Sequence, residues 1–315
     1  MRLAVARIRQ LTPAIKSFEL RRPEGGDLPQ FTAGAHVDVG VVLPDGGRAK
    51  RSYSIASAPA ERDRWEIGVL RETAGSGGSA FMHDRVSLGQ SLEVEGPSND
   101  FPLAPDAAEH LLIAGGIGIT PILAMARVLA ASGACFQLHY CARSPAEMAW
   151  REEAAALGAT LHFDGGDPSR GLDLAAVLRS PIPGRHVHVC GPKGMNNAVI
   201  ELCREAGWPA AQVHFEFFTA AAAEAGDHAI EVELRRSGRI VTVPKDMTIL
   251  DALIAAGLDP LFDCRRGECG VCTTPVLEGM PLHRDYNLTA AEKASGKMMC
   301  ICISRATTAR LVLDL

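Results

Sequence analysis

The chain has 315 residues, enough for two or three domains of about 100 residues each, and its 47% hydrophobic and 22% charged residues are typical of a water-soluble globular protein. A net charge of −5 gives no reason to expect a nucleic-acid or membrane-surface partner, and no apolar run reaches the roughly 18 residues of a membrane span. The N-terminal residues mix charges with apolar positions, unlike a signal peptide, which predicts a cytoplasmic location.

Short strand-like segments separated by turns fill the first hundred residues. They cover residues 2–8, 17–23, 36–43, 51–57, 65–71 and 91–97, and stretches rich in Pro and Gly stand between several of them. One helix is expected in this region, beginning near Ser79. The pattern predicts an antiparallel barrel or sandwich.

From about residue 108, strands alternate with helices. Strand-like runs cover residues 110–116, 135–141, 160–166 and 185–192, and helical stretches cover 121–133, 145–158 and 195–207. This order implies a parallel sheet with helices on its faces. Residues 219–229 lack a periodic pattern and are interpreted as a linker. Beyond them we expect a hairpin over 229–245, a short helix over 248–258 and strands at 298–304 and 310–315.

A first phosphate-binding pattern joins residues 51–54, on a predicted strand, to residues 75–84. Ser79 can cap the helix that follows it, and a helix N-terminus offers unpaired N–H groups to an anion. The Arg51 guanidinium can add a bidentate phosphate contact, and the ring of Tyr53 can stack on a planar cofactor. Alone, the four residues at 51–54 are more typical of a buried strand that carries one surface arginine, and their position before residues 75–84 favours the phosphate site.

A second pattern of this kind begins at the strand end Gly115-Gly116-Ile117-Gly118. Thr120 is expected to cap a helix whose first residue is Pro121, a residue favoured at that position. Residues 187–195 show a similar pattern of a strand followed by a glycine-containing turn. This places Cys190 at the carboxyl end of a strand, where open α/β sheets bind their ligands. Cys190 by itself could equally be a core thiol.

Five of the nine cysteines crowd into the last part of the chain, which indicates an inorganic site there. Cys264, Cys269 and Cys272 have the spacing C-x4-C-x2-C, which with a remote fourth cysteine is the plant-type [2Fe–2S] arrangement. A zinc site is the alternative, but zinc ribbons usually pair two C-x2-C knuckles. The fourth ligand is Cys300 or Cys302, which would share one face of a strand.

Taken in order, these motifs resemble the ferredoxin–NADP reductase superfamily, and in particular the phthalate dioxygenase reductase and vanillate demethylase reductase family. Further segments that fit include residues 99–103, 139–144, 283–289 and 302–306, so the resemblance spans the whole chain. It implies an FMN-binding antiparallel β-barrel over 1–104 and an NAD-binding domain with a parallel sheet over 105–218. A linker over 219–229 and a β-grasp [2Fe–2S] ferredoxin domain over 230–315 complete the expected organisation.

The resemblance also implies roles for individual residues. Arg51, Ser52, Tyr53 and Ser54 line the flavin, with Ser54 near its N5 atom, and Gly78 and Ser79 hold its phosphate. The pyrophosphate of the nicotinamide nucleotide is bound by Gly116, Gly118, Thr120 and Pro121. Its nicotinamide side is bound by Cys190, Gly191 and Pro192. Phe218 covers the flavin ring, and Cys302 is the fourth cluster ligand. Ser76 and Ser98 depart from the family pattern, which often has a basic residue at each position.

These assignments predict a monomeric reductase that moves electrons from NADH through FMN to the cluster and on to a Rieske-type oxygenase of small, often aromatic, substrates. A flavin is needed because nicotinamide gives up two electrons at once and the cluster accepts one. FAD and NADPH are the alternative cofactors, and Arg143, with Glu147 nearby, is the one cation that could meet a 2′-phosphate after residues 136–140. Rival functions are a reductase of a cytochrome P450 or diiron hydroxylase, or a redox-sensing subunit.

Overall fold

The computed structural model describes residues 1–73, 75–218, 224 and 226–315 of the chain. It contains two compact units, Met1–Glu216 and Phe217–Leu315, which are described separately below. The expected linker over 219–229 falls in part outside the described residues. No helix in the described ranges is both long and apolar enough to cross a membrane.

The first half of the N-terminal unit is an antiparallel barrel. Its strands are β1 (Arg2–Thr12), β2 (Ile15–Arg21), β3 (His36–Val42), β4 (Arg48–Ser54), β5 (Trp65–Leu70) and β6 (Ser91–Ser98), in the order β4-β3-β6-β1-β2-β5. A single bridge between Ile55 and Ile67 joins the two outer strands and closes the sheet. Helix α1 (Gly78–Asp84) is the one helix of the barrel, as predicted. Alternate strand residues such as Val37, Val39 and Val41 point into the core.

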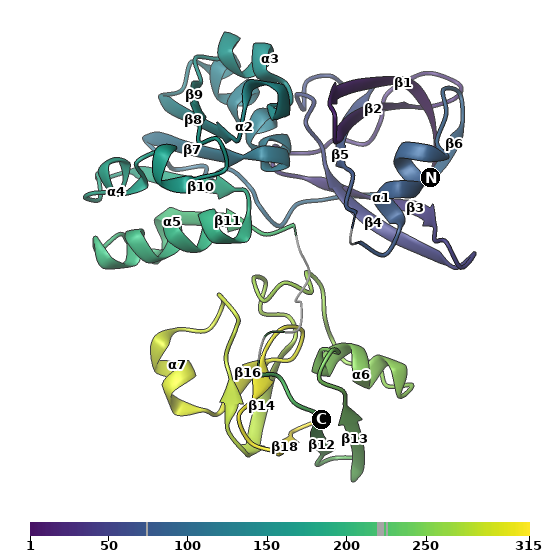
Figure 1. Cartoon of the computed structure of the whole chain (residues 1–315), viewed down its shortest axis with the longest axis vertical. Coiled ribbons are helices and arrows are strands. Elements are labelled where there is room, and N and C mark those ends of the chain that lie inside the picture. The colour runs from purple at the N-terminus through teal and green to yellow at the C-terminus, as the bar shows by residue number, and fades with distance from the viewer. Residues whose placement is uncertain (74, 219–223, 225) are drawn as a thin grey trace. The chain divides into compact units, whose positions relative to one another are not determined.

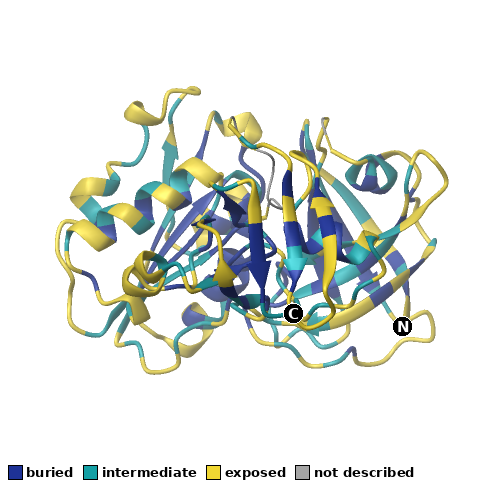
Figure 2. Ribbon diagram, turned by 90° about the horizontal axis from the view of Figure 1, so that it is seen from below, coloured by how far each residue is buried: buried dark blue, intermediate teal, exposed yellow. Residues whose placement is uncertain are grey.

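The second half is a parallel sheet with helices on its faces, as the alternating pattern predicts. Its strands are β7 (Glu109–Gly115), β8 (Phe136–Ala142), β9 (Thr160–Phe163), β10 (Arg185–Cys190) and β11 (Val213–Glu216), in the order β11-β10-β7-β8-β9. Its helices are α2 (Ile119–Ser132), α3 (Arg151–Ala156), α4 (Leu174–Val177) and α5 (Lys193–Glu205). The central strands β7 and β10 are largely buried, whereas the edge strands β9 and β11 are mostly intermediate or exposed (Figure 2).

One expected helix of this half is shorter than predicted. Residues 145–158 form a single 3₁₀ turn, Pro145–Glu147, followed by the six residues of α3. Trp150 precedes α3 with a φ of 47°, in the left-handed region, which a continuous right-handed helix cannot include. Helix α4, by contrast, has no counterpart among the predicted elements.

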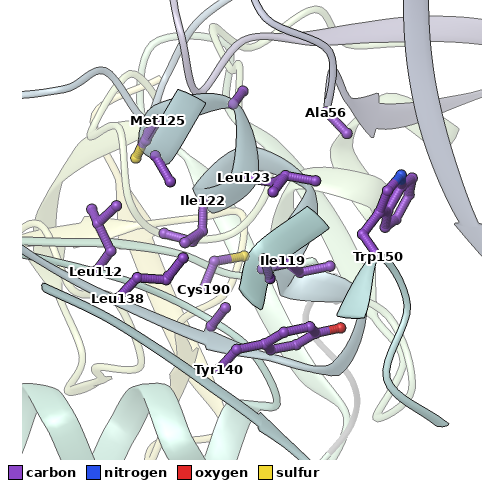
Figure 3. Packing of buried hydrophobic residues seen from close by; sticks show 14 of the residues in the cluster. Ala56, Leu112, Ile119, Ile122, Leu123, Met125, Leu138, Tyr140, Trp150 and Cys190 are labelled. Carbon is purple, nitrogen blue, oxygen red and sulfur yellow. The ribbon is translucent and has the colours of Figure 1, made fainter. Parts of the chain in front are cut away.

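The barrel and the parallel sheet share one hydrophobic core. Ala56 and Phe101 of the barrel half pack in the same cluster as Ile119 and Leu123 of α2 (Figure 3). The partly buried guanidinium of Arg127 on α2 donates a hydrogen bond to the carbonyl oxygen of Ala56 at 2.6 Å. The two halves are therefore held together by both apolar and polar contacts.

Four histidines gather on one face of the parallel sheet. His186 and His188 on β10 lie beside His110 on β7 and His214 on β11, and the His188 and His214 rings stack with centroids 4.5 Å apart. Burial and the neighbouring imidazoles lower the pKa of His188 to about 2 and that of His214 to about 4. The folded sheet therefore resists protonation of these rings.

This row of histidines predicts a loss of stability in mild acid. Below pH 6.5 the histidines of the unfolded chain become protonated, while the buried rings of the folded protein stay neutral. By pH 5 this lowers the free energy of unfolding by about 2 kcal/mol for His188 and by less for the half-buried His214. Urea unfolding at pH 7.5 and pH 5.0 measures this loss through Trp65, Trp150 and Trp208, the three tryptophans of the chain. His188→Leu should flatten the pH dependence, and an equally steep dependence in that variant would contradict the account.

The C-terminal unit is a mixed sheet with two short helices. Strands β12 (Ile230–Leu234), β13 (Arg239–Val243), β14 (Thr273–Glu278), β16 (Met298–Cys300) and β18 (Arg310–Leu313) follow the order β13-β12-β18-β14-β16, and β15 (Pro281–Leu282) pairs with β17 (Arg305–Ala306). The helices are α6 (Ile249–Ala255) and α7 (Ala290–Ser295). The hairpin β12–β13 and helix α6 were predicted. The strand expected over 298–304 ends at Cys300, where the chain turns.

Candidate functional site

The candidate flavin site lies where strand β4 meets the start of helix α1 (Figure 1). The guanidinium of Arg51 donates a hydrogen bond to the hydroxyl of Ser76. A Cβ on Gly78 would lie 2.9 Å from Nε of Arg51, so a larger residue here would require the Arg51 side chain to move. Tyr53 follows two residues after Arg51 and so faces the same side of β4, and burial raises the pKa of its phenol to about 12.

Two details of this site differ from the sequence prediction. Ser79 does not cap α1: Gly77 is the N-cap residue, and the Ser79 hydroxyl accepts a hydrogen bond from the backbone N–H of Glu72 at 3.0 Å. The Ser52 hydroxyl donates to a carboxylate oxygen of Asp38 on β3 at 2.6 Å, away from Arg51 and Tyr53. Ser54, at the end of β4, is buried.

The candidate nucleotide site lies at the topological switch point of the parallel sheet. From β7 the chain continues to β8 and β9 on one side and returns to β10 and β11 on the other. The loops that follow β7 and β10 are in close contact: a Cβ on Gly118 would lie 2.1 Å from the Cys190 carbonyl oxygen, and a Cβ on Gly191 would lie 3.1 Å from Cα of Gly115. Ligands of open α/β sheets bind at this crevice.

The structure corrects the expected helix cap at this loop. A 3₁₀ turn over Gly116–Gly118 precedes α2, which begins at Ile119 rather than Pro121. The Thr120 hydroxyl lies inside the helix and donates to the carbonyl oxygen of Ile117 at 3.0 Å. Thr120 and Pro121 are both buried, whereas Gly116 is partly accessible and has a φ of 54°.

The remaining predicted nucleotide contacts differ in exposure. The Cys190 side chain is fully buried in the core beside Ile119 and Tyr140 (Figure 3), while Gly191 is partly accessible and Pro192 is exposed. Arg143 is exposed directly after β8. Phe218 belongs to the C-terminal unit, and its side chain is 39% exposed.

The cysteine loop of the C-terminal unit is folded around its first sulfur. The backbone N–H groups of Arg266 and Cys269 each donate to Sγ of Cys264 at 3.4 Å. Gly267 and Gly270 have positive φ values of 76° and 77°, and a Cβ at either would collide with neighbouring residues. The sequence therefore provides the tight loop and the inward N–H groups that an anionic cluster requires.

The thiols of the four predicted ligands and that of Cys300 gather at this loop, where Cys269 lies beside Cys264. Interaction with the Cys302 thiol lowers the pKa of Cys264, and interaction with the Cys300 and Cys302 thiols lowers that of Cys272. Cys302 thus contacts two of the loop cysteines, whereas Cys300 contacts Cys272 and the hydroxyl of Thr273. Four thiolate donors beside inward N–H groups fit a [2Fe–2S] cluster.

No three His, Cys, Asp or Glu side chains among the described residues are arranged to hold a single metal ion. A two-iron cluster with four cysteine ligands needs only two thiolates at each iron.

Three residues that support the cysteine loop, Asp285, Asn287 and Glu268, were not predicted from the sequence. The buried carboxylate of Asp285 accepts hydrogen bonds from the backbone N–H of Leu288 at 2.9 Å and from the Ser304 hydroxyl at 3.2 Å. Asn287 packs against Gly270, and a Glu268 carboxylate oxygen accepts from the backbone N–H of Phe217 at 2.7 Å. The sequence signal for two of them was the polar run at 283–289 after the cysteine loop, which includes Asp285 and Asn287.

Comparisons with known proteins cover the whole chain. Residues 2–102 match the family described as "Oxidoreductase FAD-binding domain", and residues 232–307 match the "2Fe-2S iron-sulfur cluster binding domain". A vanillate O-demethylase oxidoreductase of Pseudomonas sp. (strain HR199 / DSM 7063) is 41% identical over 99% of this chain and 98% of its own length. Phthalate dioxygenase reductase of Burkholderia cepacia is 39% identical over 100% of this chain and 97% of its own length. The chain belongs to the phthalate dioxygenase reductase family.

Solved structures agree with this membership. A phthalate dioxygenase reductase structure covers 100% of this chain and 98% of its own, with a TM-score of 0.74 and 38% identity. An intact type IV self-sufficient cytochrome P450 monooxygenase contains the same module: it covers 100% of this chain and 41% of its own, with a TM-score of 0.73 and 36% identity. Membership in the phthalate dioxygenase reductase family confirms the predicted fold and the predicted enzyme class, a flavin- and iron–sulfur-dependent electron-transfer reductase of oxygenase systems.

Proposed function

We propose that the chain is the reductase component of a Rieske-type oxygenase and moves electrons from NADH through FMN to a [2Fe–2S] cluster. The observation that carries this proposal is the match along the full length of both phthalate dioxygenase reductase and vanillate O-demethylase oxidoreductase. When bound, the flavin converts a two-electron donor into two one-electron steps. The residues of the chain position the carriers.

Arg51 holds the flavin phosphate with its guanidinium, next to Gly78 and Ser79, and Tyr53 lies along the ring. The shared side of β4 for Arg51 and Tyr53 supports this role, while Ser52, directed at Asp38, contributes its backbone. Ser54 lies near the reacting edge of the flavin. FMN is proposed over FAD because the family lacks a dedicated site for the AMP half.

The switch point between β7 and β10 holds the nucleotide. Gly116 and Gly118 leave room for the pyrophosphate, Thr120 and Pro121 fix the helix that follows, and the Cys190-Gly191-Pro192 turn meets the nicotinamide. NADH is proposed over NADPH because the Glu147 carboxylate follows Arg143 by four residues in the sequence. A carboxylate near this cation disfavours binding of a 2′-phosphate. We expect kcat/KM to be at least about tenfold higher with NADH than with NADPH, a difference of about 1.4 kcal/mol. Equal values would contradict this choice.

Cys264, Cys269, Cys272 and Cys302 hold the cluster, with two thiolates on each iron. No disulfide links the nine cysteines, all of which lie in the described part of the chain, and this supports a reducing compartment such as the cytoplasm. The reductase is proposed to act as a monomer that forms a transient complex with its oxygenase.

A cytochrome P450 is the second candidate acceptor, because a self-sufficient P450 contains the same module. Anaerobic stopped-flow mixing of the NADH-reduced protein with a purified Rieske-type oxygenase and with a purified P450 distinguishes the two. Electron transfer to the Rieske-type protein at least about tenfold faster than to the P450 supports the proposal. The reverse preference would assign the P450 role.

A further inference from the structure

Two residues at the cysteine loop, Glu268 and Tyr286, both hold Phe217. The backbone N–H of Phe217 donates to a carboxylate oxygen of Glu268, which belongs to the loop itself, at 2.7 Å. The Phe217 ring stacks on that of Tyr286, with centroids 4.5 Å apart and an interplanar angle of 17°. Tyr286 is in turn bound to the loop, because its backbone N–H donates to the carbonyl oxygen of Gly267 at 2.9 Å.

Phe217 is the first residue of the C-terminal unit and follows directly after Glu216, the last residue of β11. It is 4% exposed, so burial of its ring adds to the stacking and to the hydrogen bond. A single peptide bond therefore separates the end of β11 from a residue that is held at the cysteine loop.

A second contact holds the chain near the end of the expected linker. The guanidinium of Arg284 donates to both carboxylate oxygens of Asp227, at 3.0 Å and 2.5 Å. The two side chains are 13% and 5% exposed, so salt screens this ion pair less than a pair on the surface. Arg284 stands two residues before Tyr286 in the sequence, so one short segment holds the chain both at Phe217 and at Asp227.

Without the contacts at Phe217, a longer stretch of chain would separate β11 from the cysteine loop. If the ion pair at Asp227 then became the point of attachment, a flexible chain from Phe217 to Asp227 would have a root-mean-square span of roughly 17 Å. A longer tether lowers the effective concentration of one linked group at the other. Because electron transfer slows steeply as two redox centres move apart, the contacts at Phe217 bear directly on its rate.

We propose that Glu268 and Tyr286 are positioning residues for electron transfer from the flavin to the cluster, because they hold Phe217 at the cysteine loop and keep the chain between β11 and that loop short. The inference rests on the proposed function. Neither residue takes up an electron or changes a covalent bond, and both act through Phe217.

The test measures two rates in the full-length holoprotein by anaerobic stopped flow: reduction of the flavin by NADH, and transfer from the reduced flavin to the cluster. The double variant Glu268→Ala/Tyr286→Ala removes both contacts with Phe217. It should lower the second rate by about tenfold, through the lower effective concentration of a longer tether, and leave the first rate unchanged. Iron content and the midpoint potential of the cluster, measured on the same samples, should equal those of the wild type.

Glu268→Gln/Tyr286→Phe is the matched control, because glutamine keeps a carbonyl oxygen that accepts a hydrogen bond and phenylalanine keeps the ring. Both of its rates should equal those of the wild type. A wild-type rate of transfer in the double alanine variant would overturn the proposal, as would an equal fall in both double variants. If the double alanine variant has lost iron or has a shifted potential, the single variants decide: slower transfer in Tyr286→Ala than in Tyr286→Phe supports the proposal, and equal transfer overturns it.

The wild-type protein separates this inference from the proposed function. Failure of NADH to reduce the cluster of the wild type would contradict the proposed function. Reduction of the wild-type cluster together with an unchanged rate in the alanine variants would contradict the role of Glu268 and Tyr286 alone.

Discussion

Cys302→Ser is expected to abolish the stable cluster, whereas Cys300→Ser leaves it in place. Both residues are buried cysteines two positions apart, so the substitutions are matched in size and location. The Cys302 thiol contacts Cys264 and Cys272 from the turn after β16, while Cys300 contacts Cys272 and pairs with Thr273 on the strand. Serine is a much poorer ligand than a thiolate for iron in such clusters, so only the ligand position is sensitive.

The measurement is iron and acid-labile sulfide per chain together with the EPR signal of the reduced protein. Cys302→Ser should contain less than about one tenth of the wild-type cluster after purification, as expected for the loss of a metal ligand. Cys300→Ser should contain a near-normal amount. A stable cluster in Cys302→Ser with loss in Cys300→Ser would show that the strand thiol is the fourth ligand.

Gly118→Ala is expected to lower the rate of flavin reduction by NADH by about 100-fold, the effect of a displacement of roughly 1 Å in a reacting geometry. A Cβ at this position would lie 2.1 Å from the Cys190 carbonyl oxygen, so the loops after β7 and β10 must move apart. The atoms nearest to the added Cβ are all backbone atoms of Cys190 and Gly191, so no flexible side chain can move aside to make room for it. The substitution therefore opens the crevice in which the nucleotide is proposed to bind.

Gly194→Ala is the matched control for this prediction. Gly194 lies in the first turn of α5, at the same edge of the sheet, and its added Cβ would meet nothing within 4 Å. It should keep near-normal flavin reduction. Flavin content and the thermal midpoint of both variants show whether the protein is folded, and a folded Gly118→Ala variant with the wild-type rate would contradict the proposed nucleotide site.

The sequence predicted the large elements because they depend on local patterns. Alternation of apolar residues, as at Val37, Val39 and Val41, defines the barrel strands, and alternation of strands with helices defines the parallel sheet. The cysteine loop was predictable from spacing and from the two glycines, which have the positive φ that the turn requires.

The details that sequence did not predict depend on tertiary contacts or on the choice between neighbouring conformations. Ser79 and Thr120 are good capping residues, but α1 already begins at Gly78 and a 3₁₀ turn precedes α2, so the N-caps are Gly77 and Gly118. Periodicity treated Cys300 and Cys302 as one strand, although the strand ends between them. Asp285 and Glu268 support the cluster loop through hydrogen bonds to residues distant in the sequence, which no local pattern reveals.

The central claim is that one chain carries electrons from NADH through a flavin to a [2Fe–2S] cluster, and an anaerobic NADH titration of the purified holoprotein tests it most directly. On addition of NADH, the visible absorbance of both the flavin and the cluster should decrease. Samples frozen from the same titration should give the rhombic EPR signal of one reduced cluster per chain. A protein without flavin absorbance, or one whose flavin is reduced by NADH while no cluster signal develops, would contradict the claim.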